Sequence, residues 1–499
     1  MNGSPIAKGA IISYVAIFLN IAITFFYTPW MIRQIGVSDY GLYSLTGTFI
    51  AYFIVDFGLS GAIARFIAKY RAEGRQDLIE NMLGLTTKIF LCIDGLIFTI
   101  LAVCYFFLTD IFKGLTIEEL DKLKVLYVIA GSFSVLSFVL QPMNGAMMAY
   151  EYFVENKLID MFQRVGSVVL IVVALLLNGG VYELVFITGA CGFMSTLLKF
   201  VIFKFKSKVH INWQFFDKSE ASILLSFSFW VFIYSLAQGF RLTMMPTVLG
   251  AVSNSTQISI FALGMTMEAM VFTLSSALNG LFLPKVTRIV LGKEGAKGVT
   301  DLMIRVGRLQ LFILSLILLG FLFVGDIFIE LWVGDSFHNS YFVLILLTLS
   351  NYISLTQSIA FDMVYAENRI KYVSIITLAS SFLSLLMSIV LAPKFGALGC
   401  AFSFCVAMNI NQLVLNLYYK RKLGLEIGRF FRNCHLKILP ALIAVTVLFM
   451  IIKTWTNIES WFGLMLFIIS YAIIYLFITY FFLINKEEKE LLSTIKVHL

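Results

Sequence analysis

Residues 461–484 read WFGLMLFIISYAIIYLFITYFFLI and contain no charged side chain. An α-helix rises about 1.5 Å per residue, so this stretch is long enough to cross the roughly 30 Å hydrocarbon core of a lipid bilayer. A similar run, LILLGFLFVGDIFIELWV, occupies residues 316–333. The whole chain follows this pattern, because 60% of its 499 residues are hydrophobic and only 13% are charged, about half the charged fraction of a soluble domain. The sequence therefore predicts an all-α polytopic membrane protein.

Fourteen apolar segments have about the length of a membrane-spanning helix. They cover residues 9–32, 40–68, 79–108, 122–148, 156–177, 182–203, 221–249, 257–288, 301–324, 341–365, 370–391, 396–419, 437–453 and 461–484. Lys and Arg are concentrated in alternate connections, as in KFKSKVHINWQFFDKSE at 204–220 and YKRK at 419–422. Because loops on the cytoplasmic side carry an excess of Lys and Arg, we expect both termini to be cytoplasmic.

The first half of the chain matches the second weakly, with a shift near 217 residues. Pro29 then lines up with Pro246, and Tyr150 lines up with Tyr365 at a slightly shorter shift. The match extends over six spans, so both halves enter the membrane from the same side, and a pseudo-two-fold axis along the membrane normal relates two six-helix bundles. The predicted parts are an N-terminal bundle (1–206), a cytoplasmic linker (207–220), a C-terminal bundle (221–422), and two additional helices with a cytoplasmic tail (423–499). A proline can kink a helix, so Pro29 and Pro246 are predicted hinges of an outer gate.

Two segments of each half carry a family resemblance. YTPWMIRQIGVSDYGLYSL at 27–45 and DFGLSGAIARFIAKYRAEG at 56–74 resemble the start of the bacterial polysaccharide flippases. SFSFWVFIYSLAQ at 226–238 and LNGLFLPKVTRIV at 278–290 resemble the opening of that family's second half. These flippases are the O-antigen and capsule repeat-unit exporters of the multidrug/oligosaccharidyl-lipid/polysaccharide (MOP) superfamily. The resemblance covers essentially the whole chain, including the layout of six, six and two spans.

The resemblance implies a substrate and a mechanism. It implies that an undecaprenyl-diphosphate-linked oligosaccharide moves from the cytoplasmic to the outer leaflet by alternating access, for surface polysaccharide biosynthesis. It further implies a multi-pass protein of the bacterial inner or plasma membrane, and a coupling ion, H⁺ or Na⁺, in place of an organic cofactor. The implied partners are membrane lipids and the polymerase and chain-length proteins of polysaccharide synthesis, with no nucleic acid.

Several charged residues lie inside the predicted spans. Asp56, Asp94 and Glu268 are acidic, and a charged carboxylate facing lipid costs about 2.5–3.5 kcal/mol. We therefore expect Asp56 or Asp94 to face the protein interior, and all three acids are candidates for ion-coupling groups or charge pairs. Arg65 lies near the cytoplasmic end of its span, where it either extends to the lipid headgroups or meets the diphosphate of the substrate.

Polar residues form a stripe on the predicted span 221–249. Tyr234, Gln238 and Arg241 follow an i, i+4, i+7 pattern and so share one helix face. Asn20 and Thr24 lie on a similar face of the equivalent first span. Such stripes either line a water-filled cavity, where these residues bind substrate, or join neighbouring helices by hydrogen bonds.

Two charge pairs are predicted from spacing and depth. Asp160 and Arg164 are four residues apart on one span, which favours an i,i+4 ion pair. Arg241 and Glu268 lie on consecutive antiparallel spans at similar depth, where pairing lowers the cost of burying both charges. Arg241 is then either permanently paired or alternates between Glu268 and the substrate diphosphate.

Two other functions remain as alternatives. A drug/cation antiporter of the same superfamily would favour acidic groups in its cavity, and Arg241 argues against it. A membrane polysaccharide polymerase or ligase would need a reaction site outside the membrane, usually on a large outer loop. The six cysteines and four histidines form no metal-binding spacing, and the chain carries no catalytic motif. We therefore expect a transporter with no metal site rather than an enzyme.

Overall fold

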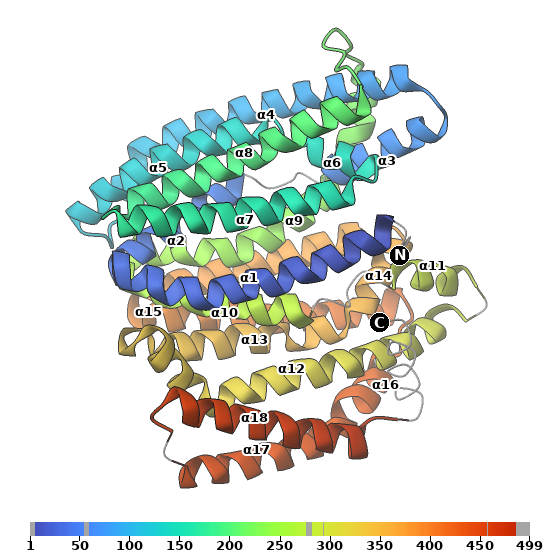
Figure 1. Ribbon diagram of the computed structural model, residues 1–499. Coiled ribbons are helices and arrows are strands. Elements are labelled where there is room, and N and C mark those ends of the chain that lie inside the picture. The colour runs from blue at the N-terminus through green and yellow to red at the C-terminus, as the bar shows by residue number, and fades with distance from the viewer. Residues whose placement is uncertain (1–4, 54–58, 276–281, 293, 457, 486–499) are drawn as a thin grey trace. The chain divides into compact units, whose positions relative to one another are not determined.

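The computed structural model describes residues 5–53, 59–275, 282–292, 294–456 and 458–485 (Figure 1). All regular secondary structure in these ranges is helical. The described residues form two compact units: residues 1–262 with 377–396, and residues 263–376 with 397–499. We call these unit 1 and unit 2. The sequence-based division of the chain at the linker 207–220 rests on the internal repeat, whereas these units rest on contacts between residues. The sequence-based division stays a prediction.

Unit 1 contains the first nine helices. Their bounds are α1 (Pro5–Ile35), α2 (Val37–Phe53), α3 (Leu59–Ala72), α4 (Gln76–Ile111), α5 (Ile117–Phe138), α6 (Pro142–Ala149), α7 (Phe153–Leu176), α8 (Val181–Ser207) and α9 (Lys218–Val252). The unit also includes the first residues of α10 (Ser255–Ser275) and residues 377–396 of α15 (Ile370–Lys422). Helices α1 and α7 pack against each other, as do α7 and α8, and α2 packs against both α5 and α9.

Unit 2 contains the remaining helices. Their bounds are α11 (Leu283–Leu291), α12 (Gly295–Val333), α13 (Ser340–Thr356), α14 (Ser358–Ala366), α16 (Ile427–Phe431), α17 (Lys437–Trp455) and α18 (Trp461–Ile478), with short η segments at Asp335–Phe337, Arg432–Leu436 and Thr479–Leu483. Aromatic side chains, among them Phe323 of α12 and Phe449 of α17, bury the last two helices against α12. The hydroxyl of Tyr471 on α18 donates a hydrogen bond to the Leu316 carbonyl at 2.9 Å.

Ten helices in the described residues are long and apolar enough to cross a membrane. The longest, α15, has 53 residues, and Gly396 inside it leaves the helical conformation at φ 54°. The predicted spans 370–391 and 396–419 therefore meet at that glycine. The chain is thus a multi-pass, all-helical membrane protein, as predicted, while the count of fourteen spans stays a prediction.

Two of the predicted spans, 122–148 and 341–365, are each divided into two helices within the described residues. These are the pairs α5 and α6, and α13 and α14. A proline opens α6, and another stands at the start of α11, where its missing N–H costs no helical hydrogen bond. The short helices pack in pairs within each unit, α3 on α6 in unit 1 and α11 on α14 in unit 2. The divisions fall at equivalent places of the two halves, which supports the internal repeat.

The topology is testable with reporter fusions after Lys208 and Lys422. Both sites lie in strongly basic connections, so we expect both fusions to report a cytoplasmic location. A fusion after Gly179, between α7 and α8, serves as the control and should report the opposite side. A periplasmic signal at Lys208 or Lys422 would contradict the predicted orientation.

Candidate functional site

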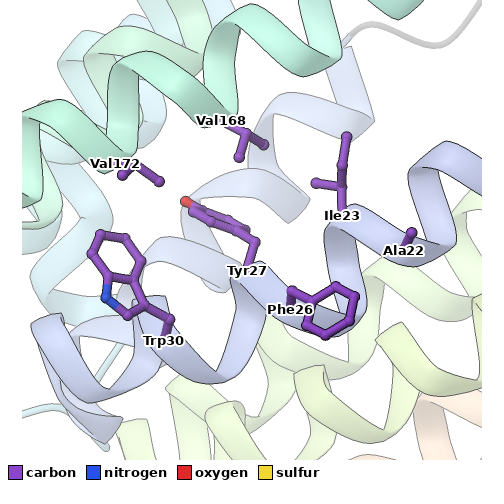
Figure 2. A pocket seen from close by; sticks show the side chains of 7 residues that line it. All are labelled: Ala22, Ile23, Phe26, Tyr27, Trp30, Val168 and Val172. Atoms are coloured by element: carbon purple, nitrogen blue, oxygen red, sulfur yellow. The ribbon is translucent and has the colours of Figure 1, made fainter.

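A groove of about 420 Å³ lies between α1 and α7 in unit 1 (Figure 2). Its lining residues are Ala22, Ile23, Phe26, Tyr27, Trp30, Val168 and Val172. Figure 2 shows the hydroxyl end of Tyr27 directed toward the two valines of α7. The Tyr27 oxygen is buried and has no hydrogen-bond partner among the described residues. The groove thus offers aromatic faces to a ligand, and the Tyr27 hydroxyl is buried beside it.

Arg164 of α7 stands beside this groove. Its Nη2 donates a hydrogen bond to Thr24 Oγ1 on α1 at 3.2 Å, and Thr24 in turn donates to the Asn20 carbonyl at 2.8 Å. Arg164 is at the middle of the 24-residue α7, roughly 17 Å from its start at 1.5 Å per residue. A charged side chain at that depth is by itself a reason to consider a functional site.

The predicted ion pair between Asp160 and Arg164 is wrong. Asp160 instead pairs with Lys199 of α8, with Oδ1 2.7 Å from Nζ. Lys199 also donates a hydrogen bond to Asn144 Oδ1 on α6 at 3.2 Å. The Lys199 side chain is only 10% exposed, so its ammonium depends on a nearby carboxylate much more than the exposed Arg164 does. Arg164 makes no ion pair with any residue that the structure describes, and it reaches α1.

Loss of the carboxylate should make the protein less stable. In Asp160→Asn, the ammonium of Lys199 stays buried with only amide partners, and we expect a loss of about 1–3 kcal/mol in the free energy of unfolding. The measurement is thermal unfolding in detergent micelles. The double variant Asp160→Asn/Lys199→Met should recover most of the loss, because it removes the buried charge together with its partner. If Asp160→Asn unfolded at the same temperature as the wild type, the ion pair would contribute nothing to the stability of the protein.

The predicted stripe on α9 is only partly described. Gln238 Nε2 donates a hydrogen bond to Tyr234 Oη at 2.9 Å, and Gln238 Oε1 is buried without a partner among the described residues. The side chain of Arg241 lies outside the described residues. The two sequence-based alternatives for this stripe therefore remain predictions.

The deep acidic residues differ in their surroundings. Asp94 of α4 is buried, and its Oδ1 has no hydrogen-bond partner among the described residues; it thus faces the interior, as its cost in lipid predicts. Glu268 of α10 is also buried, and its Oε1 accepts a hydrogen bond from Asn351 of α13 at 2.6 Å, within unit 2. Asp56 lies outside the described residues. The pairing of Arg241 with Glu268 stays a prediction.

The other predicted site residues lie apart from the groove or on its edge. Arg65 is exposed on α3, and Asn20 is exposed on α1 near Thr24. Pro29 and Pro246 lie inside α1 and α9, which both continue past them, and their hinge role stays a prediction. No group of three or more His, Cys, Asp or Glu side chains within the described part of the chain could hold a metal ion.

A second polar network joins α2, α5 and α10 where all three begin, in unit 1. The carboxylate of Glu119 accepts hydrogen bonds from Ser38 at 2.6 Å and from Ser255 at 2.5 Å. Glu119 also completes the capping box of α5 with Thr116, which holds the carboxylate in place. Ser259 of α10 donates to the Val37 carbonyl at 2.5 Å. We call Glu119 and these Ser and Thr residues the Glu119 network.

Glycines allow the backbones at the Glu119 network to come close. A Cβ atom at Gly41 of α2 would lie 2.3 Å from the Ser255 carbonyl oxygen, and one at Gly114 would lie 2.2 Å from that of Ser253. Both approaches are far shorter than any contact a side-chain carbon makes. The start of α10 therefore rests directly on α2 and on the turn before α5. The predicted topology places this end of unit 1 on the outer side of the membrane.

Comparison with known proteins identifies relatives in both sequence and fold. A model of the family described as polysaccharide biosynthesis protein matches residues 6–290. The chain is 23% identical over 498 residues to the "Uncharacterized membrane protein EpsK" of Bacillus subtilis (strain 168), with 95% of each protein covered. It resembles the solved lipid II flippase MurJ in its inward closed conformation, with a TM-score of 0.71 and 14% identity over 95% of this chain and 98% of that one. It also resembles an inward-facing multidrug resistance MATE family transporter of the MOP superfamily, with a TM-score of 0.64 and 12% identity over 83% of this chain and 98% of that one.

The two solved structures confirm the predicted fold class, since both share the helical arrangement at low sequence identity. The family match covers more than half of the chain and includes both N-terminal segments, 27–45 and 56–74, that carry the resemblance seen in the sequence. The chain belongs to the polysaccharide biosynthesis protein family.

Proposed function

We propose that this protein is a flippase that moves an undecaprenyl-diphosphate-linked oligosaccharide from the cytoplasmic to the outer leaflet of the bacterial cell membrane, for surface polysaccharide biosynthesis. The observation that carries the proposal is a mid-span arginine, Arg164, without an ion pair among the described residues, beside an aromatic groove. Membership in the polysaccharide biosynthesis family supports it. A likeness in fold to the lipid II flippase, whose substrate is also lipid-linked, supports it further.

The chemistry of the groove suits a diphosphate joined to a sugar. A diphosphate leaves water only where fixed cations and hydrogen-bond donors replace its hydration, and the planar guanidinium of arginine binds phosphate oxygens with two parallel hydrogen bonds. Arg164 supplies this cation, and the Thr24 hydroxyl, which accepts a hydrogen bond from it, lies beside it. The faces of Phe26 and Trp30 pack on apolar faces of the sugar or on the first isoprene unit. Arg65, Arg241, Gln238, Tyr234 and Asn20 remain the further candidates for this role.

The Glu119 network is the proposed outer gate of the alternating-access cycle. In this proposal the contact of α10 with α2 and α5 closes the outer end while the substrate enters from the inner leaflet. Opening then requires the hydrogen bonds of Glu119 to break and the close backbone contact at Gly41 to separate. Pro29 and Pro246 are the proposed hinges. Asp94 and Glu268, both buried in spans, are the proposed sites at which H⁺ or Na⁺ couples to the cycle.

Transport of a lipid-linked oligosaccharide can be measured in vesicles. The purified protein is reconstituted with a fluorescent undecaprenyl-diphosphate oligosaccharide, and a membrane-impermeant reductant bleaches the outer leaflet. We expect the protected fraction to fall when the protein is present, and to stay unchanged for fluorescent phosphatidylcholine. Bleaching no greater than in empty vesicles would contradict the proposal. Efflux of a cationic dye instead would support the drug/cation antiporter.

A further inference from the structure

The linker between α8 and α9 is fastened to α4. Asn212 donates two hydrogen bonds, from its backbone N–H to the Glu80 carbonyl at 3.2 Å and from its side chain to Asn81 Oδ1 at 2.8 Å. Lys88 Nζ donates to the Phe215 carbonyl at 3.1 Å. A Cβ atom at Gly84 would lie 1.9 Å from the Asn212 carbonyl oxygen, so the linker lies directly on the helix backbone. Figure 1 shows this loop beside the start of α4.

The fastened linker closes one side of a cavity of about 350 Å³ in unit 1. Its other walls come from α4, from the junction of α5 and α6, and from the end of α8, represented by Thr87, Leu140, Met143 and Phe203. The Thr87 hydroxyl donates to the Leu83 carbonyl at 2.7 Å, so its donor is already satisfied within α4. The volume is typical of a ligand pocket, and its walls are suited to a hydrocarbon chain.

Positive charge gathers at the rim of this cavity. Lys204 lines it together with His210, and Lys204 and Lys208 are exposed and make no ion pair with any residue that the structure describes. The neighbouring carboxylates are engaged elsewhere. Glu155 is paired with Lys206, and Glu80 accepts hydrogen bonds from the His210 backbone and from Gln76. Lys204 is therefore available to form an ion pair with an anion at the rim.

Exposed aromatic residues surround the same rim. Trp213, which lines the cavity, is 54% exposed, and Phe205 and Phe216 are 78% and 64% exposed. Aromatic rings of this kind are enriched at the level of lipid headgroups. Clusters of Lys next to a membrane span bind anionic headgroups, at about 1 kcal/mol per charge. The rim therefore combines the two residue types, Lys and aromatic, that favour a position at the lipid headgroups.

We propose that this cavity binds an anionic glycerophospholipid of the cytoplasmic leaflet, with one acyl chain inside the cavity and the phosphate paired with Lys204. The lipid is a resident one that holds the linker on α4, so the site is separate from the groove at Arg164. The inference stands independently of the proposed flippase activity, since it needs only the cavity, its rim and a membrane.

The test uses Trp213 as a probe inside the cavity. The full-length protein is reconstituted into vesicles that contain either dibromo-phosphatidylglycerol or dibromo-phosphatidylcholine, and the Trp213 signal is the difference between wild type and Trp213→Phe. We expect stronger quenching by the brominated anionic lipid than by the zwitterionic one. Lys204→Gln should lower that preference about fivefold. Lys420→Gln, which removes an exposed lysine from the last turn of α15, should leave it unchanged.

A second pair of variants changes the cavity without touching its lining. Gly84→Ala should push the linker off α4 and abolish the preference, whereas Gly95→Ala on the same helix, where a Cβ meets nothing within 4 Å, should keep it. Equal quenching by both lipids in the wild type would overturn the proposal. So would displacement of the brominated lipid by an equimolar amount of undecaprenyl diphosphate, which would assign the cavity to the transported lipid. Displacement by inorganic phosphate would show a site for free anions and would overturn it as well.

Discussion

Replacing Arg164 by Gln should lower the rate of lipid flipping about 10- to 100-fold, the loss expected when charge-assisted hydrogen bonds to a desolvated phosphate are removed. The protein should stay folded, because Arg164 makes no ion pair among the described residues and its hydrogen bond goes to the Thr24 hydroxyl. Arg164→Lys should retain part of the rate, since a lysine keeps the charge but not the two-pronged geometry. The measurement is the vesicle bleaching assay with the fluorescent lipid-linked oligosaccharide.

Lys157→Gln is the matched control for this prediction. Lys157 is exposed near the start of the same helix, seven residues before Arg164. The variant therefore removes an equal charge from α7 and should leave the rate almost unchanged. A well-folded Arg164→Gln variant that flips lipid at the wild-type rate would eliminate the groove as the diphosphate site. If Arg241→Gln then abolished transport, the site would lie on α9 instead.

Gly41→Ala should nearly abolish transport by preventing closure of the outer end. The added methyl group would meet the Ser255 carbonyl oxygen at 2.3 Å and the Ser259 hydroxyl at 2.7 Å. A backbone oxygen cannot rotate away, so α2 and the start of α10 have to separate. Separation breaks the hydrogen bonds of Glu119 to Ser38 and Ser255. We expect a protein that still folds, because α2 also packs on α5, α8 and α9.

Two measurements distinguish failed closure from misfolding. Gly47→Ala changes the same helix where a Cβ meets nothing within 4 Å, and it should transport normally. Ser259→Cys places a thiol at a fully buried position in the Glu119 network, and a membrane-impermeant maleimide added outside should label it slowly. Adding Gly41→Ala should accelerate labelling. Unchanged labelling together with normal transport would show that this contact is not a gate.

Fold class was within reach of the sequence because its determinants are local. The length of an apolar run and the charge of a loop depend on consecutive residues and on the thickness of a bilayer. The run 461–484 and the weak repeat that pairs Pro29 with Pro246 therefore sufficed to predict helical membrane spans in two related halves. The burial of Asp94 followed from the same reasoning, since the cost of a carboxylate in lipid does not depend on which helix lies opposite.

By itself, the sequence determined an all-helical membrane protein with a repeated architecture, Lys and Arg concentrated in alternate connections, and a short set of deep charges. The tertiary structure alone decided which partners those charges have. Asp160 forms its ion pair with Lys199, which is 39 residues away, and not with Arg164, which is four residues away. The reason is that α7 packs on α8, and that the buried ammonium of Lys199 loses more hydration than the exposed Arg164 does. The same packing turns Arg164 toward Thr24 on α1, a distance of 140 residues along the chain. Ion pairing depends on distance in space and on desolvation, and neither can be read from spacing along one helix.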